Sequence, residues 1–201
     1  YVSLVMSPSP PLAREGWHDV AFQVLSPRPG PHTLGRVLVP PATARFGVIS
    51  DIDDTVIRSG VDNKLRMLLA LLVSNHHTRV PFEGVAAFYR ALHRGESGGE
   101  GNPFFYVSSS PWNLYSPLVD FLALRDIPPG PLHLRDYGDH TAFSAAEHGT
   151  HKLAAIEAVL GTYPALSFVL IGDSGEQDPE IYSETVRRHP GRIRVVYIRK
   201  V

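Results

Sequence analysis

The 201-residue sequence contains no cysteine. This absence excludes disulfide bonds, thiolate metal sites and a cysteine nucleophile, and it removes the usual sign of an oxidising compartment. The longest apolar run, residues 67–73, is far shorter than the roughly 20 residues that cross a bilayer. No secretory signal sequence opens the chain. We therefore expect a cytoplasmic protein, and we leave open a peripheral contact with a membrane surface.

The sequence also has little net charge. Its formal net charge is -1 and its pI is near 6.9, so the chain has no global basic field that would hold a nucleic-acid backbone. We expect no nucleic-acid partner, and the sequence does not indicate an oligomeric state. Lysine is scarce, with three residues against sixteen arginines, and this scarcity makes each lysine position informative.

The first 45 residues have the pattern of paired strands. Apolar Val20, Phe22 and Val24 alternate with other residues, and a second alternating stretch, 35–40, follows a turn rich in proline and glycine. We expect residues 1–45 to form a β-hairpin appendage or the end of an upstream β-rich region. Because the chain begins at Tyr1 and not at methionine, we also expect it to be part of something longer.

From residue 46 the chain alternates short apolar runs with helical patterns, which is typical of buried parallel strands with crossover helices. We predict an α/β fold, a Rossmann-like three-layer sandwich around a mainly parallel five-stranded sheet. The expected strands are 46–50, 104–107, 132–134, 166–171 and 193–198. The expected helices are 63–73, 82–93, 112–124, 152–160 and 179–188. The segment 95–103, rich in glycine and glutamate, is predicted to be a loose surface loop at the amino-terminal edge of the sheet.

Polar residues follow three of these strands. The first strand runs into residues 51–55 (Asp-Ile-Asp-Asp-Thr), the second into Ser108, Ser109 and Ser110, and the fourth into residues 172–178. In open α/β sheets, ligands bind beyond the carboxyl ends of the strands. Three strands therefore bring oxygen-bearing side chains to one edge of the sheet.

Asp51 and Asp53 leave the same strand close together, so their charges repel unless a cation or a proton lies between them. Oxygen ligands with open positions for water and phosphate suit Mg²⁺. The alternative interpretation is that these acids cap helices or fill solvated loops.

Lys152 is expected to open the helix 152–160, where a lysine opposes the helix dipole. A bound phosphate anion would make that position favourable. The alternative is a solvated side chain at a frayed helix start.

Together these motifs resemble the four motifs of the haloacid dehalogenase superfamily: Asp-x-Asp-x-Thr at 51–55, serine after the second strand, Lys152, and Gly-Asp-x-x-x-x-Asp at 172–178. More narrowly, segments 50–56, 106–115, 134–138 and 171–182 resemble the catalytic domain of the actin-patch-protein-type phosphatidate phosphatases. The resemblance covers about residues 35–198.

The resemblance implies that Asp51 is the nucleophile, that Asp53 is the general acid and then the general base, and that Thr55 positions Asp53. Ser108 and Ser109 would bind the substrate phosphate.

By the same resemblance, Lys152 would neutralise the nucleophile and the phosphate together. Mg²⁺ would be held by the Asp51 carboxylate, the Asp53 carbonyl and Asp173. Asp178 would orient Lys152 or a metal-bound water, with Glu176 beside it as a weaker candidate.

The implied activity is that of a magnesium-dependent phosphatase with a phospho-aspartate intermediate, acting on phosphatidate or a related phospholipid monoester. Two alternatives stay open: a phosphatase of a soluble phosphomonoester, such as a sugar phosphate or a polynucleotide 3′-phosphate, and a non-catalytic module that binds Mg²⁺ or phosphate. Residues 46–201 would form the catalytic domain, with a small cap at about 58–81. The apolar helix in this cap either dips into an anionic lipid interface or packs on the sheet or a second subunit.

Overall fold

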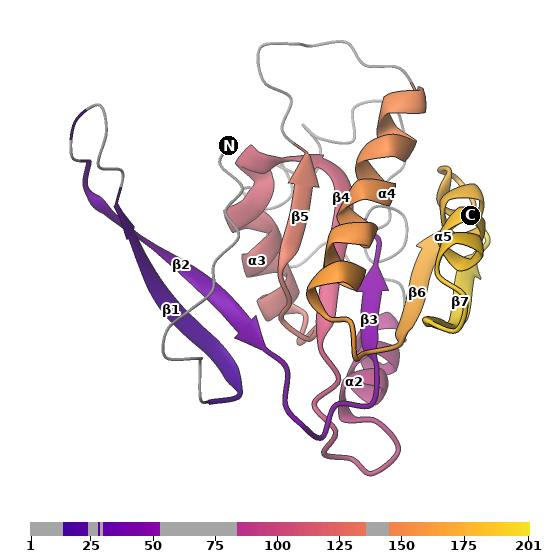
Figure 1. Cartoon of the computed structure of the whole chain (residues 1–201), viewed down its shortest axis with the longest axis horizontal. Coiled ribbons are helices and arrows are strands. Elements are labelled where there is room, and N and C mark those ends of the chain that lie inside the picture. The colour runs from indigo at the N-terminus through magenta and orange to yellow at the C-terminus, as the bar shows by residue number, and fades with distance from the viewer. Residues whose placement is uncertain (1–13, 24–27, 29, 53–83, 136–144) are drawn as a thin grey trace.

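The computed structural model describes residues 14–23, 28, 30–52, 84–135 and 145–201. Its main sheet has five strands, all parallel, in the order β5-β4-β3-β6-β7. This arrangement confirms the predicted α/β fold (Figure 1). The strands are β3 (Gly47–Ser50), β4 (Phe104–Pro111), β5 (Leu132–Arg135), β6 (Phe168–Asp173) and β7 (Ile193–Arg199).

Helices cover both faces of the sheet, because its central strands contain continuous apolar runs before their polar carboxyl ends. Val48 packs in a cluster with α2 (Val85–Arg94) and α3 (Tyr115–Leu124). The next residue, Ile49, points to the opposite face and packs in a second cluster, with α4 (Ala145–Thr162) and α5 (Asp178–Arg188). Successive strand residues point to opposite faces, so a strand buried on both sides is a continuous apolar run.

The helix boundaries follow the predicted ranges in three of the four α-helices that the structure describes. A 3₁₀ turn (Trp112–Leu114) precedes α3 within the range predicted as one helix. The exception is α4, which begins at Ala145 and not at residue 152. The helix predicted at 63–73 and the cap at 58–81 lie outside the described residues. In the part of the chain that the structure describes, no helix is long and apolar enough to cross a membrane.

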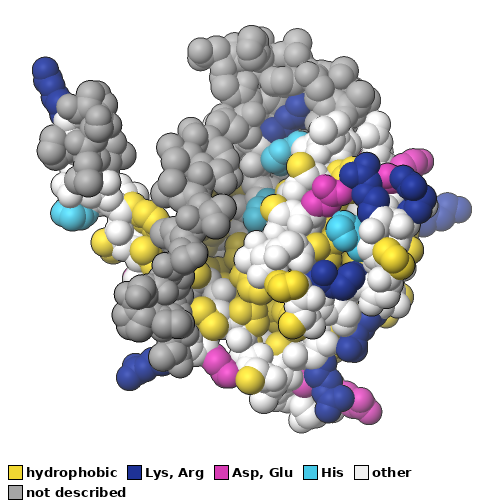
Figure 2. Space-filling model, viewed as in Figure 1, with side chains coloured by type: hydrophobic (Ala, Val, Ile, Leu, Met, Phe, Trp, Pro, Cys, Tyr) yellow, Lys and Arg dark blue, Asp and Glu magenta, His cyan; other side chains and the backbone are white. Residues whose placement is uncertain are grey.

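The predicted hairpin is present as β1 (Gly16–Gln23) and β2 (His32–Val39), which pair antiparallel from Gly16↔Val39 to Gln23↔His32. It stands apart from the main body in Figures 1 and 2. One contact to the body comes from Tyr163, whose hydroxyl donates to Leu38 O at 3.1 Å.

Figure 2 also shows charged side chains of both signs over the region of α5, where Arg187 and Arg188 both pair with Glu184.

The segment 95–103 lies at the amino-terminal edge of the sheet as predicted, since Val48 N donates to Pro103 O at 2.8 Å. The prediction of a loose surface loop holds for residues 96–99, which are exposed, but not for the end of the segment, where Asn102 is fully buried and Glu100 nearly so. The Asn102 amide oxygen accepts from Arg45 N at 2.8 Å and Phe46 N at 3.3 Å. Buried backbone N–H groups need partners, and Asn102 supplies them where the chain enters β3.

Substitution Asn102→Ala is expected to lower the free energy of unfolding by about 2 kcal/mol, because it leaves part-buried backbone groups without partners. The Asn102 amide nitrogen also donates to Leu92 O at 2.9 Å, so the end of α2 loses a contact as well. Urea unfolding measures the change. The control is Thr43→Ala, which removes one hydroxyl bond to the same segment from an exposed residue. Equal stability of the two variants would contradict this prediction.

Candidate active site

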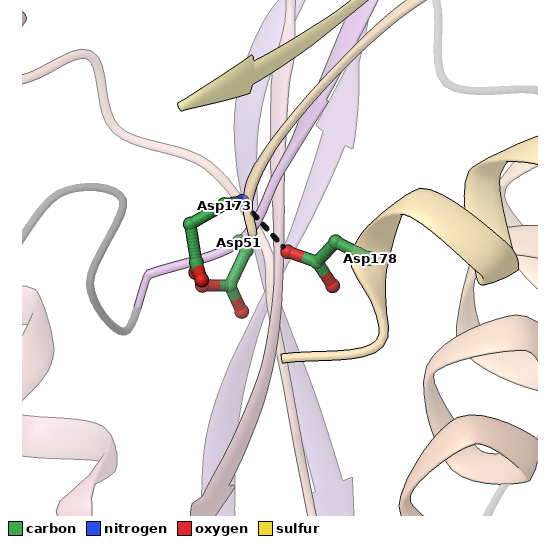
Figure 3. Close-up of side chains that lie close together, drawn as sticks. All are labelled: Asp51, Asp173 and Asp178. Carbon is green, nitrogen blue, oxygen red and sulfur yellow. Dashed lines mark hydrogen bonds between the residues drawn. The ribbon is translucent and has the colours of Figure 1, made fainter. Parts of the chain in front are cut away.

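Three buried aspartates meet at the carboxyl edge of the sheet. Asp51 follows β3, Asp173 ends β6 and Asp178 begins α5, and their side chains converge in Figure 3. Their exposed fractions are 1%, 0% and 0%. One carboxylate oxygen from each lies within 4.8 Å of the others. The neighbouring strands β3 and β6 bring Asp51 and Asp173 together, and Asp51 N donates to Ile171 O at 2.9 Å.

The turn between β6 and α5 is held by two of these carboxylates. Asp173 Oδ1 accepts from Gly175 N at 2.6 Å and Glu176 N at 3.2 Å. Asp178 Oδ2 accepts from Asp173 N at 3.1 Å, the bond drawn in Figure 3. A Cβ on Gly172 would lie 2.3 Å from Asp178 Oδ2, so this close approach requires glycine. The Gly-Asp motif therefore builds the turn as well as supplying an acid.

Lys152 reaches into this cluster from α4. Its ammonium lies 2.9 Å from Asp51 Oδ1, 2.8 Å from Asp178 Oδ1 and 2.8 Å from Glu176 Oε2. The ammonium donates hydrogen bonds to Asp178 and Glu176, and its contact with Asp51 is an ion pair. The side chain of Lys152 is 3% exposed, against 28% for Glu176. Lys152 thus joins the end of β3 to the start of α5 through a buried charge.

The protonation of the cluster follows from burial and charge. Burial by itself lowers the pKa of Lys152, but the carboxylates of Asp51, Asp178 and Glu176 outweigh it and hold the pKa well above its usual value. Burial raises the pKa of Asp178, and the neighbouring charge of Lys152 opposes that rise. The lysine is therefore a permanent cation at this site.

The expected position of Lys152 at a helix start was wrong. Because α4 begins at Ala145, Lys152 lies about 10 Å along the helix axis, beyond the first turn, where the dipole has little effect. Gly149 lies inside the helix and does not end it. A Cβ at Gly149 would lie 2.7 Å from Gln177 Oε1, so the side chain of Gln177, in the turn after β6, lies against α4 here.

The serines of β4 have different surroundings. Ser108 is fully buried, and its hydroxyl accepts from Ser110 N at 2.9 Å. Ser109 lines a pocket of about 460 Å³ together with Lys152 and Glu176. The other lining residues are Gly149, Gly175, Gln177 and Ile181. The pocket therefore opens directly onto the buried cation.

Two predicted site residues, Asp53 and Thr55, lie outside the described residues. Two arginines that the sequence analysis did not select lie at the same edge of the sheet. Arg135 ends β5, is 5% exposed and pairs in register with Pro111. Arg199 ends β7 and pairs in register with Asp173. Both follow apolar strand runs, so the strand-end rule that found the aspartates would have found them too.

Comparison with known proteins gives this arrangement a family. The family model described as "Phosphatidate phosphatase APP1, catalytic domain" matches residues 46–200. The chain is similar to phosphatidate phosphatase APP1 of Saccharomyces cerevisiae, with 33% identity over 155 residues, which make up 77% of this chain and 26% of that protein. It is also similar to an uncharacterised protein of Schizosaccharomyces pombe, with 29% identity over 158 residues, which are 78% of this chain and 25% of that protein.

The chain thus spans about a quarter of the length of these two relatives. The matched region begins before β3 and ends after β7, so it contains the whole five-stranded sheet and every described residue of the aspartate and lysine cluster. On this match, the chain belongs to the family of the phosphatidate phosphatase APP1 catalytic domain.

Proposed function

We propose that the chain is a magnesium-dependent phosphatase that transfers the phosphate of phosphatidate, or of a related phospholipid monoester, to Asp51 and then to water. The observation that carries this proposal is the buried contact of Lys152 with Asp51, because Lys152 also lines the pocket beside the turn after β6. A fixed cation beside a carboxylate suits a nucleophile that must meet a phosphate dianion. The family membership supports the substrate class.

The charges of the cluster favour a bound divalent cation. Asp51, Asp178 and Glu176 contact the Lys152 ammonium, and the buried carboxylate of Asp173 lies beside those of Asp51 and Asp178. Buried carboxylates repel one another unless a cation or a proton offsets them. Oxygen ligands at about 2.1 Å from Mg²⁺ lie at most about 4.2 Å apart, which is compatible with the 4.8 Å limit on these three aspartates. The donor set therefore fits magnesium.

Asp51 and Asp173 are the described residues that we assign as ligands of the ion. Asp178 has both oxygens engaged, one with Lys152 and the other with Asp173 N, so we assign it the role of orienting Lys152. The Asp53 carbonyl completes the set by the family resemblance. When bound, the ion would neutralise charge on the phosphate and hold it for in-line attack.

The reaction needs two displacements at phosphorus. Asp51 forms an O–P bond as the P–O bond to the alcohol breaks, and the leaving oxygen takes a proton from Asp53. Asp53 then removes a proton from water, whose oxygen attacks phosphorus and releases Asp51 and inorganic phosphate. Thr55 would position Asp53, and Ser108 and Ser109 would bind the phosphate.

Lys152 keeps its contact with Asp51 while the phosphate arrives in the pocket. Glu176, the most exposed of its three partners, also lines the pocket. The incoming phosphate oxygens would therefore compete with this carboxylate for the ammonium.

We propose that the enzyme acts from the aqueous side, in the cytoplasm, on lipid at a membrane surface.

Substrate class is tested by phosphate release from phosphatidate in mixed micelles and from soluble monoesters, including a sugar phosphate and a polynucleotide 3′-phosphate. The wild type is expected to prefer phosphatidate. Asp51→Asn is expected to lose at least about 10³-fold in kcat, because an amide is not a nucleophile for phosphorus. If the wild type cleaves soluble esters efficiently and does not cleave phosphatidate, the proposed substrate is wrong. If the wild type releases phosphate from none of these compounds, the proposed phosphatase activity is wrong.

Metal binding is tested with Asp173→Asn, which keeps the size of the side chain but removes its charge. Its affinity for Mg²⁺ is expected to fall by about 10- to 100-fold, read from the magnesium dependence of activity and from calorimetry with Mg²⁺ alone. Asp126→Asn, an exposed acid after α3, is the matched control and should bind Mg²⁺ like the wild type. Unchanged affinity in Asp173→Asn would exclude this site.

Lys152→Met is expected to destabilise the protein freed of divalent cations by about 3 to 5 kcal/mol at pH 7, because it leaves buried carboxylates without their cation. In the wild type, the raised pKa of Lys152 gives a stabilisation that is complete below the ordinary lysine pKa and is lost only as the pH rises through the raised one. In the variant, the carboxylates are repelled unless protonated, so stability should recover as the pH falls from 7 towards 5. Urea unfolding across this pH range measures the free energy of unfolding of both proteins. A difference between variant and wild type that does not change with pH would contradict the charge argument.

A further inference from the structure

A chain of hydrogen bonds joins α2 to the backbone of Asp51. Ser50 Oγ donates to Asp51 O at 2.7 Å, and the Tyr89 hydroxyl lies 2.6 Å from Ser50 Oγ. Since the single hydroxyl proton of Ser50 is used on Asp51 O, Tyr89 is the donor to Ser50. Ser50 is 0% exposed and Tyr89 1% exposed. The order is therefore Tyr89 to Ser50 to the carbonyl of Asp51.

This carbonyl lies where β3 leaves the sheet. The strand ends at Ser50, and Asp51 N still bonds to Ile171 O of β6 at 2.9 Å. The carbonyl of Asp51 lies beyond the strand, and Asp51 is 1% exposed. A buried carbonyl needs a donor, and the Ser50 hydroxyl provides one. The peptide units on both sides of the Asp51 Cα are thus hydrogen-bonded.

The two bonded sets come from opposite faces of the sheet. Ser50 lies two residues after Val48, so its side chain points to the same face of the sheet, where α2 packs, and it contacts Tyr89 there. Asp51 lies two residues after Ile49, so its side chain points to the opposite face, where α4 packs, and it contacts Lys152 there. One face therefore fixes the main chain of Asp51 while the other face holds its carboxylate.

We propose that Tyr89 and Ser50 are positioning residues for the nucleophile: they fix the main chain of Asp51 so that its carboxylate faces phosphorus in line. This inference rests on the proposed function, because it gives the pair a role only if Asp51 reacts. A displacement of about 1 Å in a reacting group can cost about 100-fold in rate. Both residues are buried, and neither is among the residues that line the pocket beside Lys152.

Tyr89 keeps its proton for this role. Burial raises the pKa of the Tyr89 phenol above its usual value, and the hydrogen bond with Ser50 and the charge of Arg199 reduce that rise only in part. The charge of Asp51 acts in the same direction as burial. The phenol is therefore a neutral donor throughout the range in which a phosphatase works, and its contribution should not vary with pH.

The experiment compares Tyr89→Phe and Ser50→Ala with Tyr106→Phe, using a chromogenic soluble phosphomonoester with Mg²⁺ as well as phosphatidate micelles. Tyr106 is the matched control: it is fully buried, and its hydroxyl donates to a backbone carbonyl, Pro128 O, at 2.6 Å. Tyr89→Phe and Ser50→Ala are expected to lower kcat by about 10- to 100-fold, with KM changed less than about twofold, because substrate contacts remain. Tyr106→Phe should keep its kcat while losing similar thermal stability.

The double variant Tyr89→Phe/Ser50→Ala separates a shared role from two independent ones. If both residues act through the Asp51 carbonyl, the double variant loses no more kcat than the worse single variant. Three outcomes would each overturn the inference: a double variant whose loss of kcat is the product of the two single losses, an equal loss of kcat in Tyr106→Phe, or an unchanged kcat in Tyr89→Phe. In each of these cases an active wild type would still uphold the proposed function. A wild type inactive on every phosphomonoester would overturn both.

Discussion

The buried ammonium of Lys152 is the interaction on which the arrangement of the site depends. It contacts the acid at the end of β3, the acid at the start of α5 and a third in the turn between β6 and α5. Without a cation, these buried carboxylates would repel one another in a medium where charges are poorly screened. With it, the neighbouring strands β3 and β6 can both lead into buried acids, and the pocket is lined in part by a buried positive charge.

The parallel sheet explains why this interaction is possible. Parallel strands present all their carboxyl ends at one edge, so β3, β4 and β6 place Asp51, the serines and Asp173 together. The two faces then have separate tasks. Helix α4 carries Lys152 to the side chain of Asp51, while α2 carries Tyr89 towards its backbone.

The sequence predicted the parts of this site that follow from the order of strands and their ends. Asp51 and Asp173 could be selected because apolar runs marked the strands and the acids came at their carboxyl ends. Lys152 was selected because lysine is scarce in the chain, although the helix start expected for it was wrong. The sequence did not predict where α4 begins, because Gly149 has low helix propensity and nothing local shows that the helix continues through it. Asn102 was missed for a similar reason, since a segment of glycines and polar residues resembles any surface loop until its partners in β3 are known. The Tyr89 bond joins residues far apart in the chain, and no local pattern indicates it.

The central place of β3 has a consequence for how the molecule folds. This strand pairs with β4 on one side and with β6 on the other, and β6 comes from the last third of the chain. Pairings between distant segments form slowly, because the chain entropy must be lost before the contacts stabilise the fold. Asp51 therefore meets Lys152 and Asp173 only after most of the sheet has assembled. A partly folded chain therefore lacks the ammonium beside Asp51 on which the proposed phosphate chemistry depends.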